Sequence, residues 1–535
     1  MLTDRSPIIR LLLLSALALL PLTPLLAAPS NETPGPAFVD WKRGVEKQNN
    51  AARDARREIE AENYSPKKVL AFFADDSGYV RDAVFEKTLE SASDDQILAL
   101  AGGLLHSEPL VAENVAELLG RRKLAAAGPL LEKAIGRSKF TGARTEMLWA
   151  LGECDPELAG KTALAVLKKE KRVWEVRAEA LQLAAAHGGE KGREAIDDAL
   201  EDSKRLPMRI AALHALRSLD PTAAVLAAQA QLQSPPKDKK QIWVPRIELV
   251  ALQTLALQAK SGVAAETWRP VIDHLIDSAE EATGRGRAAR FETLAAITGE
   301  DLPSEVPSWR SWWTVKRDSW EPGSPSTGPQ PASGKEEKDG GTAVLKFHGI
   351  PVDSGRVTFL QDLSGGMDRN LAGESGGDGP TRLDHAKSEL ARVLGELDDR
   401  TWVNVITFAS TYFAPYEQPQ ILKRARKKVV QFCRSQEIPT KPGHARGNVY
   451  DALAYATASP YVDTIYLVSE GAPTEGKFHD YDRFLRHYER WNRWYGVRVH
   501  VLLVAETGGR NRSFLDRLSK GTGGVMQGIE TKETR

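Results

Sequence analysis

Cysteine is almost missing from this chain, because only Cys154 and Cys433 occur in 535 residues. The two lie far apart in the sequence, and buried free cysteine is common in proteins, so we expect two buried thiols and no disulfide. A chain this poor in cysteine is held together by hydrophobic cores and not by covalent cross-links. Its length exceeds what one core usually supports, which predicts several domains.

Net charge is missing too, since Lys+Arg and Asp+Glu number 72 each. This balance gives no general attraction to nucleic acid or to anionic lipid. Enzyme signatures are also missing: there is no Gly-x-x-x-x-Gly-Lys-Ser/Thr phosphate loop, no Gly-x-Ser-x-Gly elbow, no His-Glu-x-x-His helix and no Cys/His cluster. We therefore expect neither an enzyme nor a protein that binds nucleic acid or a small-molecule substrate.

An uncharged apolar run occurs at the amino terminus, where Arg5 and Arg10 precede Leu11 to Leu20 and a small-residue end at Ala27-Ala28. This three-part layout predicts a secretory signal peptide over residues 1–28 and an extracytoplasmic protein, either periplasmic or secreted. The cleavage region is imperfect, so an uncleaved membrane anchor is the alternative. Two prolines and the short apolar run disfavour a full membrane span.

Residues 37–320 are rich in Ala, Leu, Glu, Arg and Lys with helical spacing and almost no strand signal. A similar helix face recurs at Arg144, Arg177 and Arg209, with spacings of 33 and 32 residues. Such a period predicts an all-α solenoid, and the pattern resembles HEAT-like repeats. We expect these arginines to pair along the stack, although a ligand-binding row is the alternative.

A tryptophan cluster closes this region, at Trp309, Trp312, Trp313 and Trp320. We expect it to cover the open end of the solenoid, because a terminal repeat has no next neighbour. A platform for sugars or for a membrane interface is the alternative. Residues 321–342 are rich in Pro, Gly and Ser without apolar periodicity, which predicts a flexible linker.

Residues 343–531 alternate apolar strands with helical segments, and the strands are expected at Val357, Val403, Thr464 and Val499. This alternation predicts an α/β domain with a doubly wound, mostly parallel sheet. The first strand stops at Asp362, which a short polar loop with two glycines follows. Ligands bind at the carboxyl ends of strands in such sheets, so this loop is the candidate site.

Three short motifs of this domain stand out, namely Asp362–Ser364, Gly447–Leu453 and Ser469–Gly471. Together they resemble motifs of the von Willebrand factor A family. Its hallmark is a strand that ends in Asp-x-Ser-x-Ser and forms, with a later Thr and Asp, the metal ion-dependent adhesion site. Asp362 and Ser364 match the first two ligands, and Gly366 stands where the family has the second Ser. The segment Gly447–Leu453 resembles the family's Gly-Gly-Thr-Asn-x-Tyr-Asp-Ala-Leu, with Gly447 at the Thr position. Glu470 replaces the Asp of the Ser-Asp-Gly turn.

The resemblance implies that Asp362, Ser364 and Glu470 are the candidate ligands of Mg²⁺ or Mn²⁺. It also implies a partner-binding face around these ligands, formed by Gly366, Arg446, Gly447, Asn448 and Gly471. In the family an acidic side chain of the partner completes the coordination of the metal.

These features predict an exported, non-enzymatic interaction or scaffolding protein that binds a protein partner through a degenerate adhesion site. A metal-independent assembly module is the first alternative. A serine hydrolase that uses Ser364 is the second.

Overall fold

The computed structural model describes residues 36–239, 242–324, 345–371, 379–471, 473–504 and 509–529. The chain divides into two compact units. The first consists of Gln48–Ile196, and the second joins the described residues of Pro34–Lys47 to those of Asp197–Arg535. The predicted signal segment 1–28 lies outside the described residues, as do residues 325–342 of the predicted linker.

The elements of the first unit are helices, and their buried residues form a hydrophobic core. Proline begins several of its helices, where the missing N–H costs no hydrogen bond, and Asp155 caps the helix at Pro156 by accepting from the N–H of Leu158 at 3.0 Å. The unit contains part of α2 (Pro36–Ala61) and then α3 (Pro66–Phe73), α4 (Gly78–Ser91), α5 (Asp94–Leu98), η1 (Ala99–Leu105), α6 (Pro109–Arg121), η2 (Ala125–Ala127), α7 (Gly128–Ile135), α8 (Thr141–Cys154), α9 (Pro156–Lys169), α10 (Trp174–His187) and the start of α11 (Gly189–Glu201).

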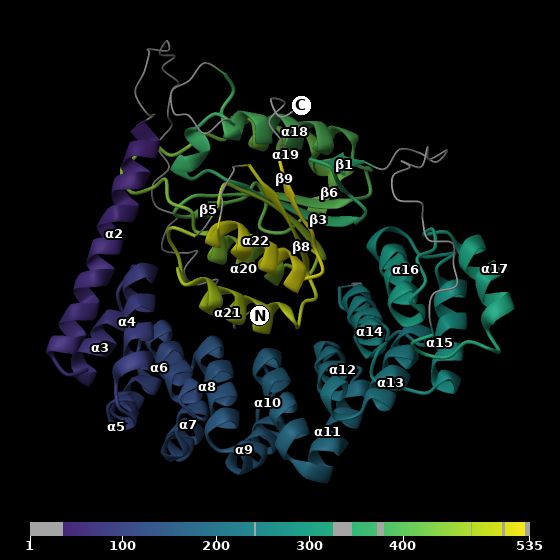
Figure 1. Cartoon of the computed structure of the whole chain (residues 1–535), viewed down its shortest axis with the longest axis horizontal. Helices are drawn as coiled ribbons and strands as arrows, with labels where there is room; N and C mark the ends of the chain where they lie inside the picture. Colours follow the sequence, from purple (N-terminus) through teal and green to yellow (C-terminus); the bar gives the residue numbers. More distant parts are fainter. Residues whose placement is uncertain are drawn as a thin grey trace. The chain divides into compact units, whose positions relative to one another are not determined.

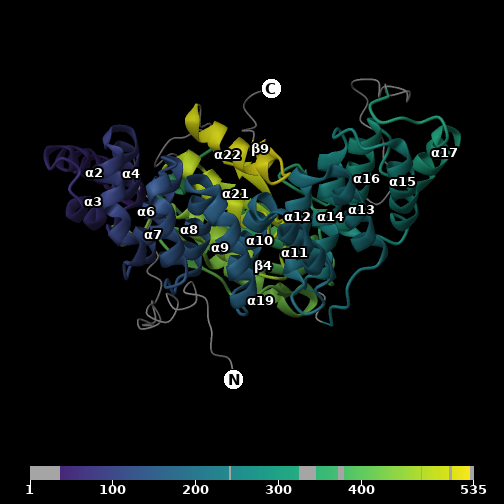
Figure 2. The same ribbon diagram turned by 90° about the horizontal axis from the view of Figure 1, so that it is seen from below.

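The second unit opens with further helices of the same kind: α12 (Pro207–Leu219), α13 (Pro221–Gln233), α14 (Val244–Gln258), α15 (Ala265–Ser278), α16 (Gly284–Thr298) and α17 (Val306–Lys316). In Figures 1 and 2 these helices follow one another in chain order. The prediction of helical repeats followed by an α/β domain is confirmed. Among the described residues, no helix combines the length and the apolar character that a membrane crossing needs.

The recurring arginines bond within the helical stack, as expected. Arg144 reaches Glu170 at 2.7 Å, Arg177 donates to the carbonyl of Glu170 at 2.6 Å, and Arg209 donates to the side chain of Gln231 at 2.9 Å. Each of these arginines therefore connects its helix to a neighbouring segment of the same chain through hydrogen bonds of its guanidinium group.

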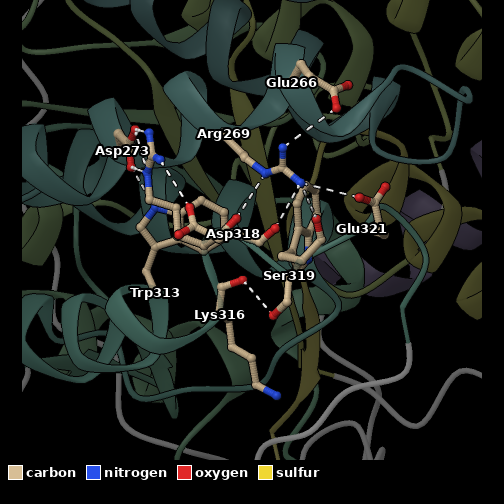
Figure 3. Close-up of polar contacts among 10 residues, drawn as sticks. Glu266, Arg269, Asp273, Trp313, Lys316, Asp318, Ser319 and Glu321 are labelled. Atoms are coloured by element: carbon tan, nitrogen blue, oxygen red, sulfur yellow. Dashed lines mark hydrogen bonds and ion pairs between the residues drawn. The ribbon is translucent and has the colours of Figure 1, made fainter.

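The tryptophan cluster packs α17 against α15 at the end of the helical region. Trp309, Trp313 and Trp320 are buried. Asp273 of α15 accepts from the indole N–H of Trp313 at 2.6 Å, and Figure 3 shows these two side chains together. Asp273 also accepts from Arg317 at 2.8 Å. These contacts fit the prediction of a covering layer, because the rings are turned into the protein and their large apolar area is used there.

The α/β domain is built on a seven-stranded sheet among the described residues, with the order β5-β4-β3-β7-β8-β9 and β6 also paired with β4. The four central pairings of β4, β3, β7, β8 and β9 are parallel, whereas β5 and β6 run antiparallel to β4. The strands are β3 (Arg356–Asp362), β4 (Trp402–Phe408), β5 (Tyr412–Phe413), β6 (Gln420–Ile421), β7 (Thr464–Ser469), β8 (Arg498–Leu503) and β9 (Met526–Gly528), and β1 (Lys346–Phe347) and β2 (Ile350–Pro351) form a separate pair. All four predicted strands are present.

Helices cover both faces of the sheet, which makes the central strands apolar on both sides. Figure 1 shows α18 (Arg382–Glu396) and α19 (Leu422–Ser435) on one face, and α20 (Val449–Ala458), α21 (Tyr481–Asn492) and α22 (Arg510–Gly521) on the other. Thr381 caps α18 in a capping box with Asp384. Cys154 and Cys433 are both free and buried, as expected.

Helices α12, α14 and α16 bond to the loops that enter the strands. Arg246 donates to the carbonyls of Ser459 and Val462, and His214 contacts the carbonyl of Arg493 at 2.8 Å. Arg285 donates to the carbonyl of Asp463. The second unit thus combines these helices with the α/β domain, whereas the sequence places a domain boundary at 321–342. Independent folding on either side of that linker stays a prediction.

Candidate functional site

The candidate site lies where the strand order of the sheet reverses. After β3 the chain moves to β4 on one side, and after β7 it moves to β8 on the other side. Because β3 and β7 are parallel neighbours, their carboxyl ends open a crevice between the two diverging connections. Asp362 ends β3 and Ser469 ends β7, so the sheet itself brings these two residues together.

Asp362 is buried, and both of its carboxylate oxygens are engaged. Oδ1 accepts from the N–H of Ser364 at 2.7 Å, and Oδ2 accepts from the hydroxyl of Ser469 at 2.9 Å. Burial raises the pKa of Asp362, and the hydrogen bonds from both serines oppose that rise. This carboxylate links the ends of the two strands.

Ser364 keeps a buried hydroxyl that has no hydrogen-bond partner among the described residues. In particular, no histidine of the described part of the chain bonds to it, and the side chain of His444 is exposed. The activated pair that a serine hydrolase needs is therefore not formed by these residues.

Glu470 fills the space that a second serine would use. A Cβ added to Gly366 would lie only 1.7 Å from Oε1 and 2.0 Å from Oε2 of Glu470. The carboxylate of Glu470 thus occupies the space that a side chain at position 366 would need. The longer side chain at 470 therefore fits in this position only because residue 366 has no side chain.

A buried guanidinium completes this arrangement. Arg382, at the start of α18, is 3% exposed. Its Nη1 donates to Oε2 of Glu470 at 3.1 Å and to the carbonyl of Gly366 at 3.3 Å. Arg369 approaches the same carboxylate at 3.5 Å. The site therefore contains its own fixed positive charge.

Burial and the nearby charge of Asp362 raise the pKa of Glu470 to about 7, and the two arginines act against this rise. Burial likewise lowers the pKa of Arg382, with the charge of Arg369 acting in the same direction and Glu470 opposing it. Each group is costly to bury in its charged form, so each needs the other in place.

The remaining positions predicted for the partner-binding face lie around the same loops. Gly447 donates its N–H to the hydroxyl of Thr474 at 2.7 Å, and the N–H of Gly471 donates to the hydroxyl of Ser469 at 3.3 Å. Gly366, Gly447 and Gly471 are all buried.

Asn448 and Arg446 have structural contacts of their own. Asn448 caps α20, because its Oδ1 accepts from the N–H of Asp451 at 3.3 Å. Arg446 is half-buried and lies 3.8 Å from Glu475. The structure thus brings the predicted residues to one end of the sheet, where most of them are occupied by internal contacts.

These residues do not fit the Mg²⁺ or Mn²⁺ that the resemblance implies. Mg²⁺ takes about six oxygen ligands in near-octahedral geometry. Glycine at 366 and 447 offers no side-chain oxygen, both oxygens of Asp362 accept hydrogen bonds, and Glu470 is paired with Arg382. A divalent cation here would also meet the buried positive charge of Arg382, which repels it.

Sequence reasoning missed Arg382, Arg369, Ser469 and Thr474. Ser469 had a visible signal, since it ends a predicted strand directly before Glu470. The two arginines had none, because they lie outside the matched motifs and reach the site only through the placement of α18 and the preceding loop. Thr474 brings a hydroxyl beside Gly447, where the family that the sequence resembles has a threonine.

No protein-family model matches the chain, and no curated protein matches it either. Among solved structures, the chain is similar to the conserved hypothetical protein BatB from Bacteroides thetaiotaomicron, with 18% sequence identity and a TM-score of 0.25. The match covers 33% of this chain and 91% of that chain. It is also similar to the PilB minor pilin from Streptococcus sanguinis, with 14% sequence identity and a TM-score of 0.27. This match covers 33% of this chain and 56% of that chain. No conclusion about function follows from similarities at this level.

Proposed function

We propose that this chain is a non-enzymatic interaction protein whose α/β domain is a metal-independent module of the von Willebrand factor A type. The observation that carries the proposal is the buried pair of Arg382 and Glu470, which fills the space beside Gly366. In this view the guanidinium supplies permanently the positive charge that a metal would supply. This assignment replaces the cation-dependent adhesion site as the preferred hypothesis.

The chemistry of partner recognition changes with the charge. A bound metal has open coordination positions that an acidic side chain of a partner can enter. Arg382 offers no such position, because it is buried and already donates to Glu470 and to the carbonyl of Gly366. Binding at this end of the sheet would rely on shape, apolar contacts and hydrogen bonds, and it would persist in chelator.

The helical region supports an interaction role of the same kind. Stacked helical repeats give extended surfaces on which partners bind. We further propose an extracytoplasmic location, periplasmic or secreted, because residues 1–28 have the layout of a signal peptide. The partner in this proposal is another protein.

The experiment that tests the proposal is a thermal melt of the full chain in EDTA, Mg²⁺ and Mn²⁺. We expect the same melting temperature in all three, because ligand binding to the native state raises it only where a site exists. The variant Gly366→Ser/Gly447→Thr/Glu470→Asp/Arg382→Met restores the family's oxygen set and removes the guanidinium, so it serves as the positive control for a metal response. A saturable rise in the wild type that Asp362→Ala abolishes would overturn the proposal.

A further inference from the structure

We infer that the strand-end face of the α/β domain is a helix-binding site and that it holds the chain's own segment 36–47, so that an external partner must displace this segment. The inference rests on the proposed function, because it names the class of ligand that the same face takes. The segment is the first part of α2 and belongs to the same compact unit as the α/β domain.

The loop of the candidate site touches the segment directly. Gly365 follows Ser364, and a Cβ added there would lie 2.6 Å from the carbonyl oxygen of Ala37 and 2.6 Å from Cβ of Trp41. Real Cβ atoms do not approach other atoms this closely, so the helix and the loop meet backbone to backbone. A glycine at 365 is what permits this approach.

A hydrogen bond fixes the helix against the next loop of the site. Asp40 accepts the backbone N–H of Gly443 at 2.7 Å. A charged acceptor for a backbone N–H makes a stronger bond than a neutral one, and it holds only one register of the helix. An acidic side chain of the segment is thus used here as a hydrogen-bond acceptor for the loop.

Aromatic packing connects the segment to the buried ion pair. The rings of Phe38 and Trp41 stack with their centroids 5.6 Å apart, and the guanidinium of Arg369 lies 5.1 Å from the ring of Phe38. Arg369 also faces Glu470 at 3.5 Å. One side of this cation therefore contacts the helix, and its other side contacts the site.

A second glycine marks a second close approach. A Cβ added to Gly44 would lie 3.0 Å from Nε of Arg446, a residue of the predicted partner-binding face. Glycine inside a helix is less stable than alanine, so its use here is explained by the neighbouring side chain and not by helix stability.

These contacts define the class of ligand as an amphipathic helix with two aromatic residues three positions apart and an aspartate between them. They also commit the site to one occupant, since Ala37, Asp40, Trp41 and Gly44 all meet the loops of the same domain. A matching segment of a second copy, or of a partner, would make the same contacts and would compete.

Hydrogen exchange of the full chain gives the first test. We expect the amides of 36–47 to exchange at least ~10-fold faster in Gly365→Ala than in the wild type, because the added methyl separates the helix from the loop. Gly355→Ala is the matched control, since nothing lies within 4 Å of its Cβ position. Equal exchange in the two variants would overturn the inference. Protection of 36–47 that rises with protein concentration would overturn it too, because the occupant would then be a second copy.

Peptide binding in trans gives the second test. The probe is a fluorescent peptide with the sequence of residues 36–50, and the receptor is the full chain with Phe38→Ala/Asp40→Ala/Trp41→Ala, which frees the face without altering it. We expect this variant to bind the probe at least ~10-fold more tightly than the wild type, whose own segment competes. A peptide with Asp40→Ala and Trp41→Ala is the control and is expected not to bind.

The result separates the two proposals when binding is measured in EDTA and in Mg²⁺. Binding that requires Mg²⁺ would overturn the metal-independent function and leave the helix site standing. Equal affinity of the wild type and the triple variant for the probe, together with melting temperatures that ignore metals, would overturn the helix site alone.

Discussion

The substitution Gly366→Ala isolates the packing at the centre of the candidate site. Its added Cβ would lie 1.7 Å from Oε1 of Glu470, which would have to retreat by about 1.7 Å to reach the 3.4 Å of an ordinary contact. That shift takes the carboxylate away from Arg382, to which it is bonded at 3.1 Å. Gly366 does not have a positive φ, so alanine accepts its backbone conformation and the effect comes from the side chains.

The expected loss of stability follows from the separated pair. Leaving one partner of a buried ion pair uncompensated costs about 3–5 kcal/mol. Replacing glycine by alanine returns about 0.4–1 kcal/mol, because the unfolded chain loses conformational freedom. We therefore expect Gly366→Ala to destabilise the end of the sheet by about 2–4 kcal/mol.

Native-state hydrogen exchange in low urea is the suitable assay, because it reports the opening free energy of β3 and β7 without treating the whole chain as two-state. Gly395→Ala is the matched control: this glycine is exposed in α18 and nothing lies within 4 Å of its Cβ position. We expect the control to leave β3 and β7 unchanged.

A double-mutant cycle tests the cause of the loss. In a Glu470→Ala background the clash no longer exists, so Gly366→Ala should cost nothing further there. An equal cost in both backgrounds would refute the argument that Glu470 occupies the space beside Gly366.

Two further outcomes are expected elsewhere in the protein. Arg246→Met should speed hydrogen exchange over residues 457–463 and lower the opening free energy there by about 2–3 kcal/mol, because it leaves buried carbonyls without their donor. Arg209→Met is the control and should not change this exchange, since Arg209 bonds within the helical stack. Similar exchange in both variants would contradict this role of Arg246. Burial and two nearby arginines lower the pKa of His500 to about 3 in the folded state, from about 6.5 in the unfolded chain. Only the unfolded chain takes up this proton as the pH falls below 6.5, so the free energy of unfolding is highest above pH 6.5 and decreases below it. Between pH 7 and pH 5 we expect His500 to contribute a loss of about 2 kcal/mol. Glu470, whose pKa is about 7 in the folded state, opposes this loss in both proteins, so the contribution is measured as the difference between urea titrations of the wild type and of His500→Gln. An equal acid dependence in the two proteins would contradict this role of His500.

The elements of this fold could be predicted from local patterns, because burial imposes a period on the sequence. Mostly apolar runs such as Val403–Phe408 marked strands buried on both faces, and the recurring faces at Arg144 and Arg177 marked repeat helices. The position of Asp362 also followed from the sequence, since a strand that stops at a carboxylate places it at the carboxyl end of the sheet.

The content of the site was decided by tertiary structure. Glu470 and Arg382 are 88 residues apart, and Asp40 and Gly443 are 403 apart. No local sequence pattern predicts these two contacts, because they depend on how helices and loops are placed around the folded sheet. A glycine at 366 looks like a lost ligand in the sequence. Only the packed structure shows that the carboxylate of Glu470 occupies its space and that a guanidinium lies beside that carboxylate.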